Sequence, residues 1–508
     1  MPLKKHTFFK NAVIMTFTSF ILRGLGVLLR VYLSNKIGAE GMGLYQIILS
    51  VYILSSTFAT AGVSTAAIQI VNDEMTKGTK QTVLKAFKKA LIICISWGIL
   101  LSLLMYNLSE FIGKYWLNDV RTIPALKIAV FALPFMATTS CIKGYFTAYR
   151  RISIPSEAQI LEQFVRIVLI FLTIDYFLPY GINAACVAII IGDVISEMSS
   201  CIYSYIAYLK EKKRHGNEYL LRTYKSPSVL NKFIKVASPI ALNKYLNTAL
   251  RTFENILIPD SLAKYNSSHE KALEQFGLLK GMAMPVLFFP SSLLTAFSTL
   301  LIPEIAEAKS LGNENAVKEI TIKTLKISIL ISILIAGIFY LFAYELSELI
   351  YKNIEIGTII KTLSLVVPFM YLETVVMGIL QGLNQQIYSL KYNIFDSIIR
   401  ITLIYLLVPQ NGLNMFLIIM ILSNMTTSSL NVYRSLKVTN VKFDIKNWAI
   451  VPLFSIFLAI TITSFTIGKY ISSTLLYVVS GSILISIIYL TTLFLLNVIT
   501  IKDFKLKY

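Results

Sequence analysis

The stretch YVVSGSILISIIYLTTLFLL, residues 477–496, carries no charged side chain. A helix of this length spans about 30 Å at about 1.5 Å per residue, which is the thickness of the hydrocarbon core of a bilayer. ISILISILIAGIFYLF (327–342) and ALIICISWGILLSLLMY (90–106) have the same character. Lipid offers no hydrogen-bond partners to the backbone, and these segments lack the alternating polarity of barrel strands. The spans must therefore be helices.

The composition of the whole chain agrees with these segments. Of its 508 residues, 56% are hydrophobic, and the mean hydropathy is +0.68. This is more apolar surface than one soluble core can bury. We predict an all-α polytopic membrane protein with about fourteen transmembrane helices, near 9–33, 43–71, 89–112, 123–149, 156–178, 183–209, 230–258, 276–302, 322–344, 358–383, 390–408, 412–433, 447–468 and 473–499.

Basic residues gather in alternate connections between the spans. The connections 77–89, 210–225 and 434–446 are rich in lysine and arginine, and the intervening ones are poor in them. The positive-inside bias then places both termini in the cytoplasm of a multi-pass protein of the cell membrane. Much of the net charge of +20 is explained by this topology and by contact with anionic lipid, so no nucleic-acid partner is expected. The first segment contains Arg23 and Arg30 and no small-residue cleavage site, so we interpret it as a retained span.

Signatures of catalysis and metal binding are missing from the sequence. The four cysteines lie in apolar segments without ligand spacing, and the three histidines are far apart. No G-x-x-x-x-G-K-[ST] loop occurs, so an on-board ATPase has no support. We therefore expect neither an enzyme nor a primary pump, and no cofactor beyond a coupling ion of unknown identity.

The chain repeats itself at a fixed offset of 234 residues. LPFMATTSCIKGYF (133–146) aligns with VPFMYLETVVMGIL (367–380), which matches Pro134 to Pro368 and Gly144 to Gly378. The same offset matches RIVLIFL (166–172) to RITLIYL (400–406). Chance hydrophobic similarity rarely preserves proline, glycine and arginine together, so spans 1–6 repeat as spans 7–12.

The repeat predicts three parts of the chain. These are an N-terminal lobe at 1–210, a C-terminal lobe at 229–437 and an extra helix pair at 446–500. Because each lobe has an even number of spans, both copies run the same way through the membrane, as in some two-lobed transporters. Such lobes hold a site between them and open it to each side by rocking. Structural duplication without transport is the alternative.

Charges inside spans point to the transport path, because charge in hydrocarbon is costly unless it serves one. Spans 1, 7 and 8 carry the candidate substrate-binding cations Arg23, Arg30, Lys244, Arg251 and Lys280. Guanidinium forks and ammonium groups suit phosphate oxygens. Alternatively, Arg30 extends to the outer interface and Lys244 lies near the inner one.

Carboxylates inside spans are the candidates for ion coupling or for the cavity wall. They are Asp193, Glu197, Glu254 and Glu373. Glu254 could instead neutralise Arg251 one helical turn away. The pairs Glu162/Arg166 and Asp396/Arg400 have i, i+4 spacing in both repeats, which favours structural ion pairs over a role in transport.

Two segments resemble a known family. LRGLGVLLRVYLSNKIGAEGMGLYQI (22–47) and FGLLKGMAMPVLFFPSSLLTAFSTLLIPEIAEA (276–308) are similar to the stage V sporulation protein B branch of polysaccharide flippases. This branch belongs to the MOP exporter superfamily, which also holds MurJ-type lipid II flippases and multidrug exporters. The resemblance implies fourteen spans in two six-helix lobes, with two last helices forming an apolar groove for a polyprenyl tail. MurJ-type proteins place arginines in spans 1, 2 and 8. This chain has Arg23 and Arg30 in span 1, Ser55 and Ser56 near the expected site of span 2, and Lys280 roughly a turn away in span 8.

The residues and the resemblance lead to the same hypothesis. A flippase would carry a lipid-linked saccharide, with lipid II for cell-wall or spore-cortex peptidoglycan as the leading substrate, from the cytoplasmic to the outer leaflet. Its expected partners are this lipid, membrane lipids and cell-wall synthesis proteins. The alternative is a cation-coupled multidrug antiporter of the same superfamily, which would favour carboxylates in its cavity. A scaffold for wall or spore-coat assembly is a third interpretation.

Overall fold

The computed structural model describes residues 5–77, 80–215, 228–466 and 473–499. Within these ranges every regular element is helical, which confirms the predicted all-α class. The chain forms two compact units, Met1–Asp260 (unit 1) and Ser261–Tyr508 (unit 2). Residues 216–225 of the basic connection 210–225, and Lys469 between the last two predicted spans, fall outside the described residues.

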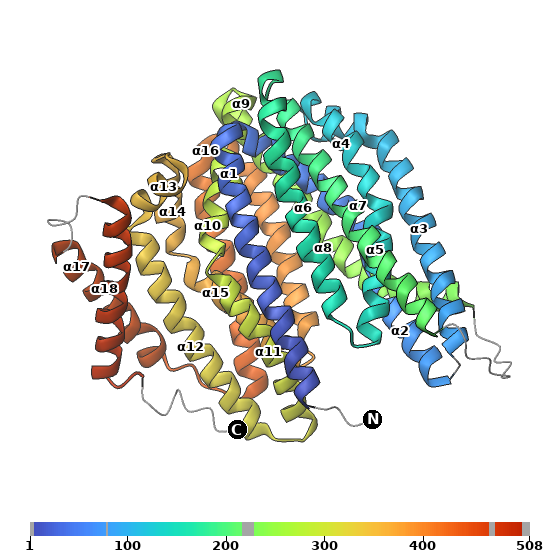
Figure 1. Ribbon diagram of the computed structural model, residues 1–508. Coiled ribbons are helices and arrows are strands. Elements are labelled where there is room, and N and C mark those ends of the chain that lie inside the picture. The colour runs from blue at the N-terminus through green and yellow to red at the C-terminus, as the bar shows by residue number, and fades with distance from the viewer. Residues whose placement is uncertain (1–4, 78–79, 216–227, 467–472, 500–508) are drawn as a thin grey trace. The chain divides into compact units, whose positions relative to one another are not determined.

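Unit 1 is a bundle of long helices joined by short ones. Its elements are α1 (Lys5–Thr60), α2 (Val63–Lys77), α3 (Lys80–Phe111), η1 (Ile112–Trp116), η2 (Val120–Thr122), α4 (Ile123–Ala129), η3 (Val130–Ala132), α5 (Leu133–Ala148), α6 (Ser153–Phe177), η4 (Leu178–Tyr180), α7 (Ile182–His215) and most of α8 (Val229–Asn266). Helix α5 packs against α2, α3 and α7, and α6 lies along α7 (Figure 1). The side chains of α5 are therefore enclosed on several sides.

Unit 2 begins near the end of α8. Its elements are α9 (His269–Phe276), η5 (Gly277–Ala283), α10 (Met284–Phe288), α11 (Ser291–Ser310), α12 (Glu314–Leu341), α13 (Ala343–Tyr351), α14 (Glu355–Ser364), α15 (Val367–Gly382), α16 (Gln386–Thr439), η6 (Lys446–Ile450), α17 (Val451–Thr466) and α18 (Thr474–Leu495). Helix α15 packs against α11, α12 and α16, as α5 does in unit 1. The pair α17 and α18 packs on α12 (Figure 1).

The sequence repeat is also a repeat of backbone conformation and packing. Left-handed residues recur 234 positions apart, at Asn118 and Lys352 and again at Arg150 and Asn384. A methyl group at Gly144 would lie 2.5 Å from the carbonyl oxygen of Ser64. In unit 2 the equivalent Gly378 is as close to Ser298, whose carbonyl oxygen would lie 2.8 Å from such a methyl group. Only glycine allows this helix contact, which explains why both copies retain it.

The number of membrane crossings stays a prediction. Within the described residues, eight helical segments are long and apolar enough to span, or up to ten when two bent helix pairs are included. Two of the eight, Ile21–Thr76 and Gln386–Thr439, have 56 and 54 residues and break at Gly38 and Gly412, where φ is positive. Each is long enough for two crossings of about 30 Å. Charged helices such as α6 and α8 are not among the eight.

The division between lobes at 210–229 also stays a prediction. The boundary of the compact units falls between Asp260 and Ser261, and α8 packs with unit 1 up to that point. Hydrogen bonds that join α8 to α1 are described with the candidate site.

Candidate functional site

The five predicted substrate-binding cations are not enclosed in helix packing. Arg23, Arg30, Lys244 and Arg251 are exposed on α1 and α8 of unit 1, and Lys280 is half-buried in η5 of unit 2. No salt bridge within the described residues involves Arg30, Lys244 or Arg251. The structure thus places four of the five cations, Arg23, Arg30, Lys244 and Arg251, on one unit with exposed side chains.

Helix α8 is fastened to the second half of α1 by hydrogen bonds. Thr252 Oγ1 donates to the Ser50 carbonyl oxygen at 3.2 Å, and Asn255 Nδ2 donates to Ser50 Oγ at 3.1 Å. The Tyr245 hydroxyl donates to the Phe58 carbonyl oxygen at 3.1 Å. These bonds fix the orientation of α8 in unit 1, and with it the positions from which Lys244 and Arg251 project.

The break between α1 and α2 exposes the Phe58 carbonyl oxygen to this bond. Gly62 has φ +77°, so the helix stops at Thr60 and restarts at Val63. Trp97 of α3 donates a second hydrogen bond to the same carbonyl oxygen at 3.0 Å. Carbonyl groups freed at a helix break need such partners, since lipid provides none.

An ionic cluster lies between α6 and α7. Arg166 Nε is 2.7 Å from Asp193 Oδ1, and Arg166 Nη2 is 2.9 Å from Glu162 Oε1 and 4.0 Å from Glu197 Oε1. Asp193 and Glu197 are only 3% and 8% exposed. The predicted Glu162/Arg166 pair therefore forms, but it is part of a cluster in which three carboxyl groups share one guanidinium.

The second repeat keeps only the simple form of this cluster. Arg400 Nη1 lies 3.5 Å from Asp396 Oδ2, and Ser423 Oγ donates to Asp396 at 2.7 to 2.8 Å. Counting from the positive-φ glycines that precede them, Asp193 and Glu197 correspond to Asn424 and Ser428. The two extra carboxyl groups are therefore not required by the shared fold, which points to a task specific to unit 1.

The remaining predicted carboxylates lie elsewhere. Glu254 is buried on α8, whereas Arg251 on the same helix is exposed, and Glu373 is half-buried on α15. Among the described residues, no group of three or more histidine, cysteine or carboxylate side chains is arranged to hold a metal ion.

Sequence reasoning missed one candidate, Lys143 of α5. Its side chain is exposed, interacts electrostatically with Glu162 and is repelled by Lys244. It lies inside a segment that served only to establish the repeat, where the equivalent residue is Met377. An intramembrane lysine without a counterpart in the second copy was the signal that could have identified it.

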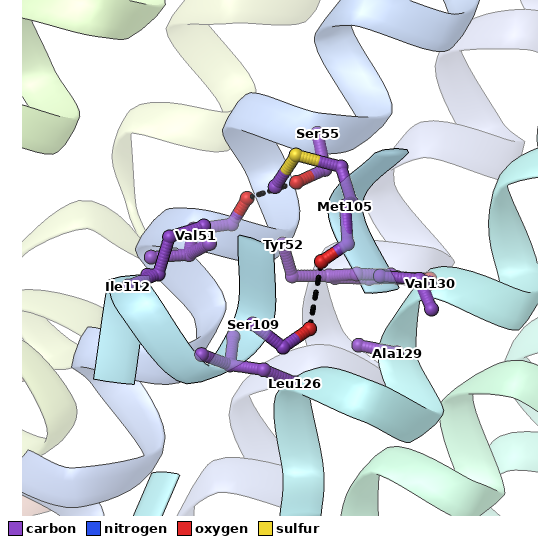
Figure 2. Close-up of a pocket in the computed structure, with 9 residues that line it drawn as sticks. All are labelled: Val51, Tyr52, Ser55, Met105, Ser109, Ile112, Leu126, Ala129 and Val130. Carbon is purple, nitrogen blue, oxygen red and sulfur yellow. Dashed lines mark hydrogen bonds between the residues drawn. The ribbon is translucent and has the colours of Figure 1, made fainter. Parts of the chain in front are cut away.

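An apolar pocket in unit 1 opens between α1, α3 and α4. Figure 2 shows Ser55 and Ser109 in its wall, each donating to a carbonyl oxygen of its own helix, at Val51 and Met105. Both hydroxyl groups therefore already donate their hydrogen within the helix, and most of the other lining side chains are apolar. This pocket offers little to a charged head group.

The chain is similar in sequence to known families and relatives. The profile of the family "Polysaccharide biosynthesis protein" matches residues 8–309, and the MatE profile matches residues 265–406. Stage V sporulation protein B of Bacillus subtilis (strain 168) is 25% identical over 92% of this chain and 90% of its own length. Lipid II flippase MurJ of the same organism is 24% identical over 78% of this chain and 76% of its own.

A solved structure shares the fold. Lipid II flippase MurJ in an inward closed conformation superimposes with a TM-score of 0.71 at 14% identity, covering 94% of this chain and 98% of that one. At this identity the likeness concerns the fold alone. The predicted resemblance to the stage V sporulation protein B branch is confirmed, and because the family profile covers more than half of the sequence, the chain belongs to the polysaccharide biosynthesis protein family.

Proposed function

We propose that the protein is a flippase that carries a lipid-linked saccharide from the cytoplasmic to the outer leaflet by alternating access. Family membership and the names of the two relatives, stage V sporulation protein B and lipid II flippase MurJ, support this class of activity. The observation that carries the proposal is the set of exposed cations on the helices α1 and α8 of unit 1.

The cations match the chemistry of such a substrate. A charged residue at the centre of a membrane helix costs about 2.5 to 3.5 kcal/mol on insertion scales, so several exposed ones require a compensating ligand or water. A lipid-linked saccharide carries a phosphate or diphosphate head, and a guanidinium binds two phosphate oxygens at once. Helices α17 and α18 expose many large apolar side chains, including Phe457 and Leu490, which suit a polyprenyl tail.

The leading substrate is lipid II, the cargo in the name of one relative. The sequence has no nucleotide-binding loop, so the driving force in this proposal is the membrane potential or an ion gradient. The cluster around Arg166 is our candidate for the coupling site. One guanidinium cannot neutralise three carboxyl groups, two of which are buried, and the cluster therefore calls for a bound proton or cation.

Export of organic cations is the alternative, and the MatE match to residues 265–406 speaks for it. A cation exporter needs carboxylates that face its cargo. Asp193 and Glu197 are instead buried against Arg166, while the exposed charges on α1 and α8 are positive. Head-group chemistry therefore favours an anionic substrate.

Reconstitution tests the proposal directly. Vesicles containing the protein and fluorescent lipid-linked saccharides are assayed for the fraction of label that becomes accessible in the opposite leaflet. Arg23→Ala and Arg251→Ala should each abolish transfer, and Arg→Lys at these positions should restore it only partly because lysine lacks the two-pronged fork. Lys85→Ala, which removes an exposed cation near the start of α3, is the matched control.

The outcomes separate the three functions. Wild-type transfer by both arginine-to-alanine variants would refute the cationic site. Export of a cationic dye without transfer of any lipid would establish the antiporter. Neither activity would leave a scaffold for cell-wall or spore-coat assembly, for which cell-wall synthesis proteins are the expected partners.

A further inference from the structure

A second pocket in unit 1 lies between α5, α6 and α7 and encloses a cavity of about 60 Å³. One water molecule needs about 10 to 15 Å³ of such space, so this cavity has room for a small ion with one or two waters and not for a sugar ring. Side chains that carry oxygen atoms line it from all three helices, at Thr139 of α5, Glu162 of α6 and Ser200 of α7. Carboxylate and hydroxyl oxygens are hard ligands, which hard metal cations prefer.

Two of the lining hydroxyl groups have no hydrogen-bond partner. Ser200 is fully buried, and among the described residues neither its Oγ nor the buried Thr139 Oγ1 forms a hydrogen bond. Neighbouring serines of α7 are satisfied, because Ser196 donates to the Asp193 carbonyl oxygen and Ser199 to that of Ser196, each at 2.7 Å. Burying a hydroxyl group without a partner is unfavourable. The cavity therefore calls for an occupant that interacts with both oxygens.

The charges around the cavity indicate the sign of this occupant. Glu162 belongs to the cluster around Arg166, in which three carboxyl groups share one guanidinium. Lys143 also lines the cavity, but its side chain is exposed, and no salt bridge in the described part of the chain includes it. With the carboxyl groups ionised, three negative and two positive charges leave this set of groups with a net charge of −1. One monovalent cation neutralises that charge, whereas a divalent cation would reverse it.

We propose that this cavity binds one sodium or potassium ion, held by the Glu162 carboxylate and the hydroxyl oxygens of Thr139 and Ser200, with water completing the coordination. Because it offers a single carboxylate, the site differs from the groups of three or more charged or imidazole ligands that hold divalent metals. The ion also brings positive charge to the carboxyl cluster, which one guanidinium leaves short of it. Its role as the coupling ion rests on the proposed flippase function, whereas its binding does not.

Direct binding of the ion to purified full-length protein in detergent micelles tests the site. The probes are radioactive sodium and, in place of potassium, radioactive rubidium, titrated at constant ionic strength with choline chloride as the replacement salt. Wild-type protein should bind one ion per chain. Glu162→Gln should weaken binding by about ten- to a hundredfold, and Ser200→Ala and Thr139→Val by about three- to tenfold each, because each removes one oxygen ligand.

Lys143→Met should have the opposite effect. It removes an ammonium group that repels the cation, so it should tighten binding by about two- to tenfold. The second repeat has Met377 at the equivalent position, so the fold accommodates this side chain. Asp396→Asn is the matched control, since it removes the carboxyl group equivalent to Glu162 from unit 2, where Arg400 and Ser423 already satisfy it. This variant should leave the affinity unchanged.

The outcomes separate the ion site from the proposed function. Absence of binding to wild-type protein would overturn the site, as would wild-type affinity in both Glu162→Gln and Ser200→Ala or weaker binding by Lys143→Met. Ser200→Ala keeps every ion pair of the cluster and so remains informative if Glu162→Gln does not fold. Wild-type protein that binds the ion but flips no lipid-linked saccharide would overturn the proposed function and leave the site standing. Equal flipping in choline, sodium and potassium salts would overturn the coupling role.

Discussion

Removing the guanidinium from each repeat in turn should have very different consequences. In unit 1, Arg166→Gln would remove the guanidinium that lies within 4.0 Å of Glu162, Asp193 and Glu197. In unit 2, Arg400→Gln would leave one carboxylate, Asp396, whose two oxygens still accept a hydrogen bond from Ser423. The same substitution thus strands three carboxyl groups in one case and one partly satisfied carboxyl group in the other.

The magnitudes follow from the contacts. Breaking a buried ion pair by removing one partner costs about 3 to 5 kcal/mol, and Arg166→Gln should lie in this range because Asp193 is almost fully buried. Arg400→Gln should cost about 1 to 2 kcal/mol, the scale of one hydrogen bond to a charged group when the acceptor keeps another donor. Arg166→Gln/Asp193→Asn should recover part of the loss, because the second change removes one stranded carboxylate.

Equilibrium unfolding of the purified variants in mixed micelles measures these free energies, with helicity as the signal. The cycle of Arg166→Gln, Asp193→Asn and the double variant isolates the coupling between the two residues. Equal losses of unfolding free energy for Arg166→Gln and Arg400→Gln would refute the interpretation that the unit 1 cluster depends more strongly on its arginine than the unit 2 pair does. Additive effects around the cycle would show that the 2.7 Å contact between Arg166 and Asp193 contributes no net energy.

Three other expectations concern orientation, packing and acid stability. A cysteine at Lys213 should resist an impermeant thiol reagent added outside cells while one at Lys264 reacts, and the reverse pattern would invert the topology. Gly144→Ala should lower the free energy of unfolding by about 1 to 3 kcal/mol because the added methyl group meets a backbone oxygen. Gly24→Ala should be tolerated because no atom lies within 4 Å of the added methyl group, and similar losses for both variants would contradict the tight contact at Gly144. Hydrogen bonds from the backbone and side-chain nitrogens of Asn447 hold the pKa of Asp444, in the α16–α17 connection, below its usual range. The Asp444 carboxylate therefore stabilises the folded protein above its ordinary pKa, and this contribution is lost as the pH falls through its lower pKa in the folded state. Asp444→Asn should remove this dependence of the free energy of unfolding on pH, measured between about pH 2 and 5. An unchanged pH profile would show that other groups cause the loss of stability in acid.

Much of the fold could be predicted from the sequence because the bilayer constrains it so strongly. Segments such as 477–496 can satisfy their backbone only as helices, and the helix α18 at Thr474–Leu495 follows directly. The repeat was equally visible, since Gly144 and Gly378 are retained for a close helix contact that no other residue allows. The charged candidates on α1 and α8 were identifiable from their cost in hydrocarbon alone.

Side-chain partnerships across helices were beyond the reach of the sequence. The i, i+4 spacing indicated the pair Glu162/Arg166, but Asp193 lies 27 residues further along the chain and approaches Arg166 only because α6 packs along α7. The placement of α8 in unit 1 likewise depends on hydrogen bonds from Tyr245 and Thr252 to backbone oxygens of α1. Sequence determined which segments are helical and which residues are charged, since both follow from local transfer free energies. Tertiary packing alone decided which carboxyl groups share one arginine and that the Ser200 hydroxyl remains unpaired in a pocket, because these depend on distances between side chains of different helices.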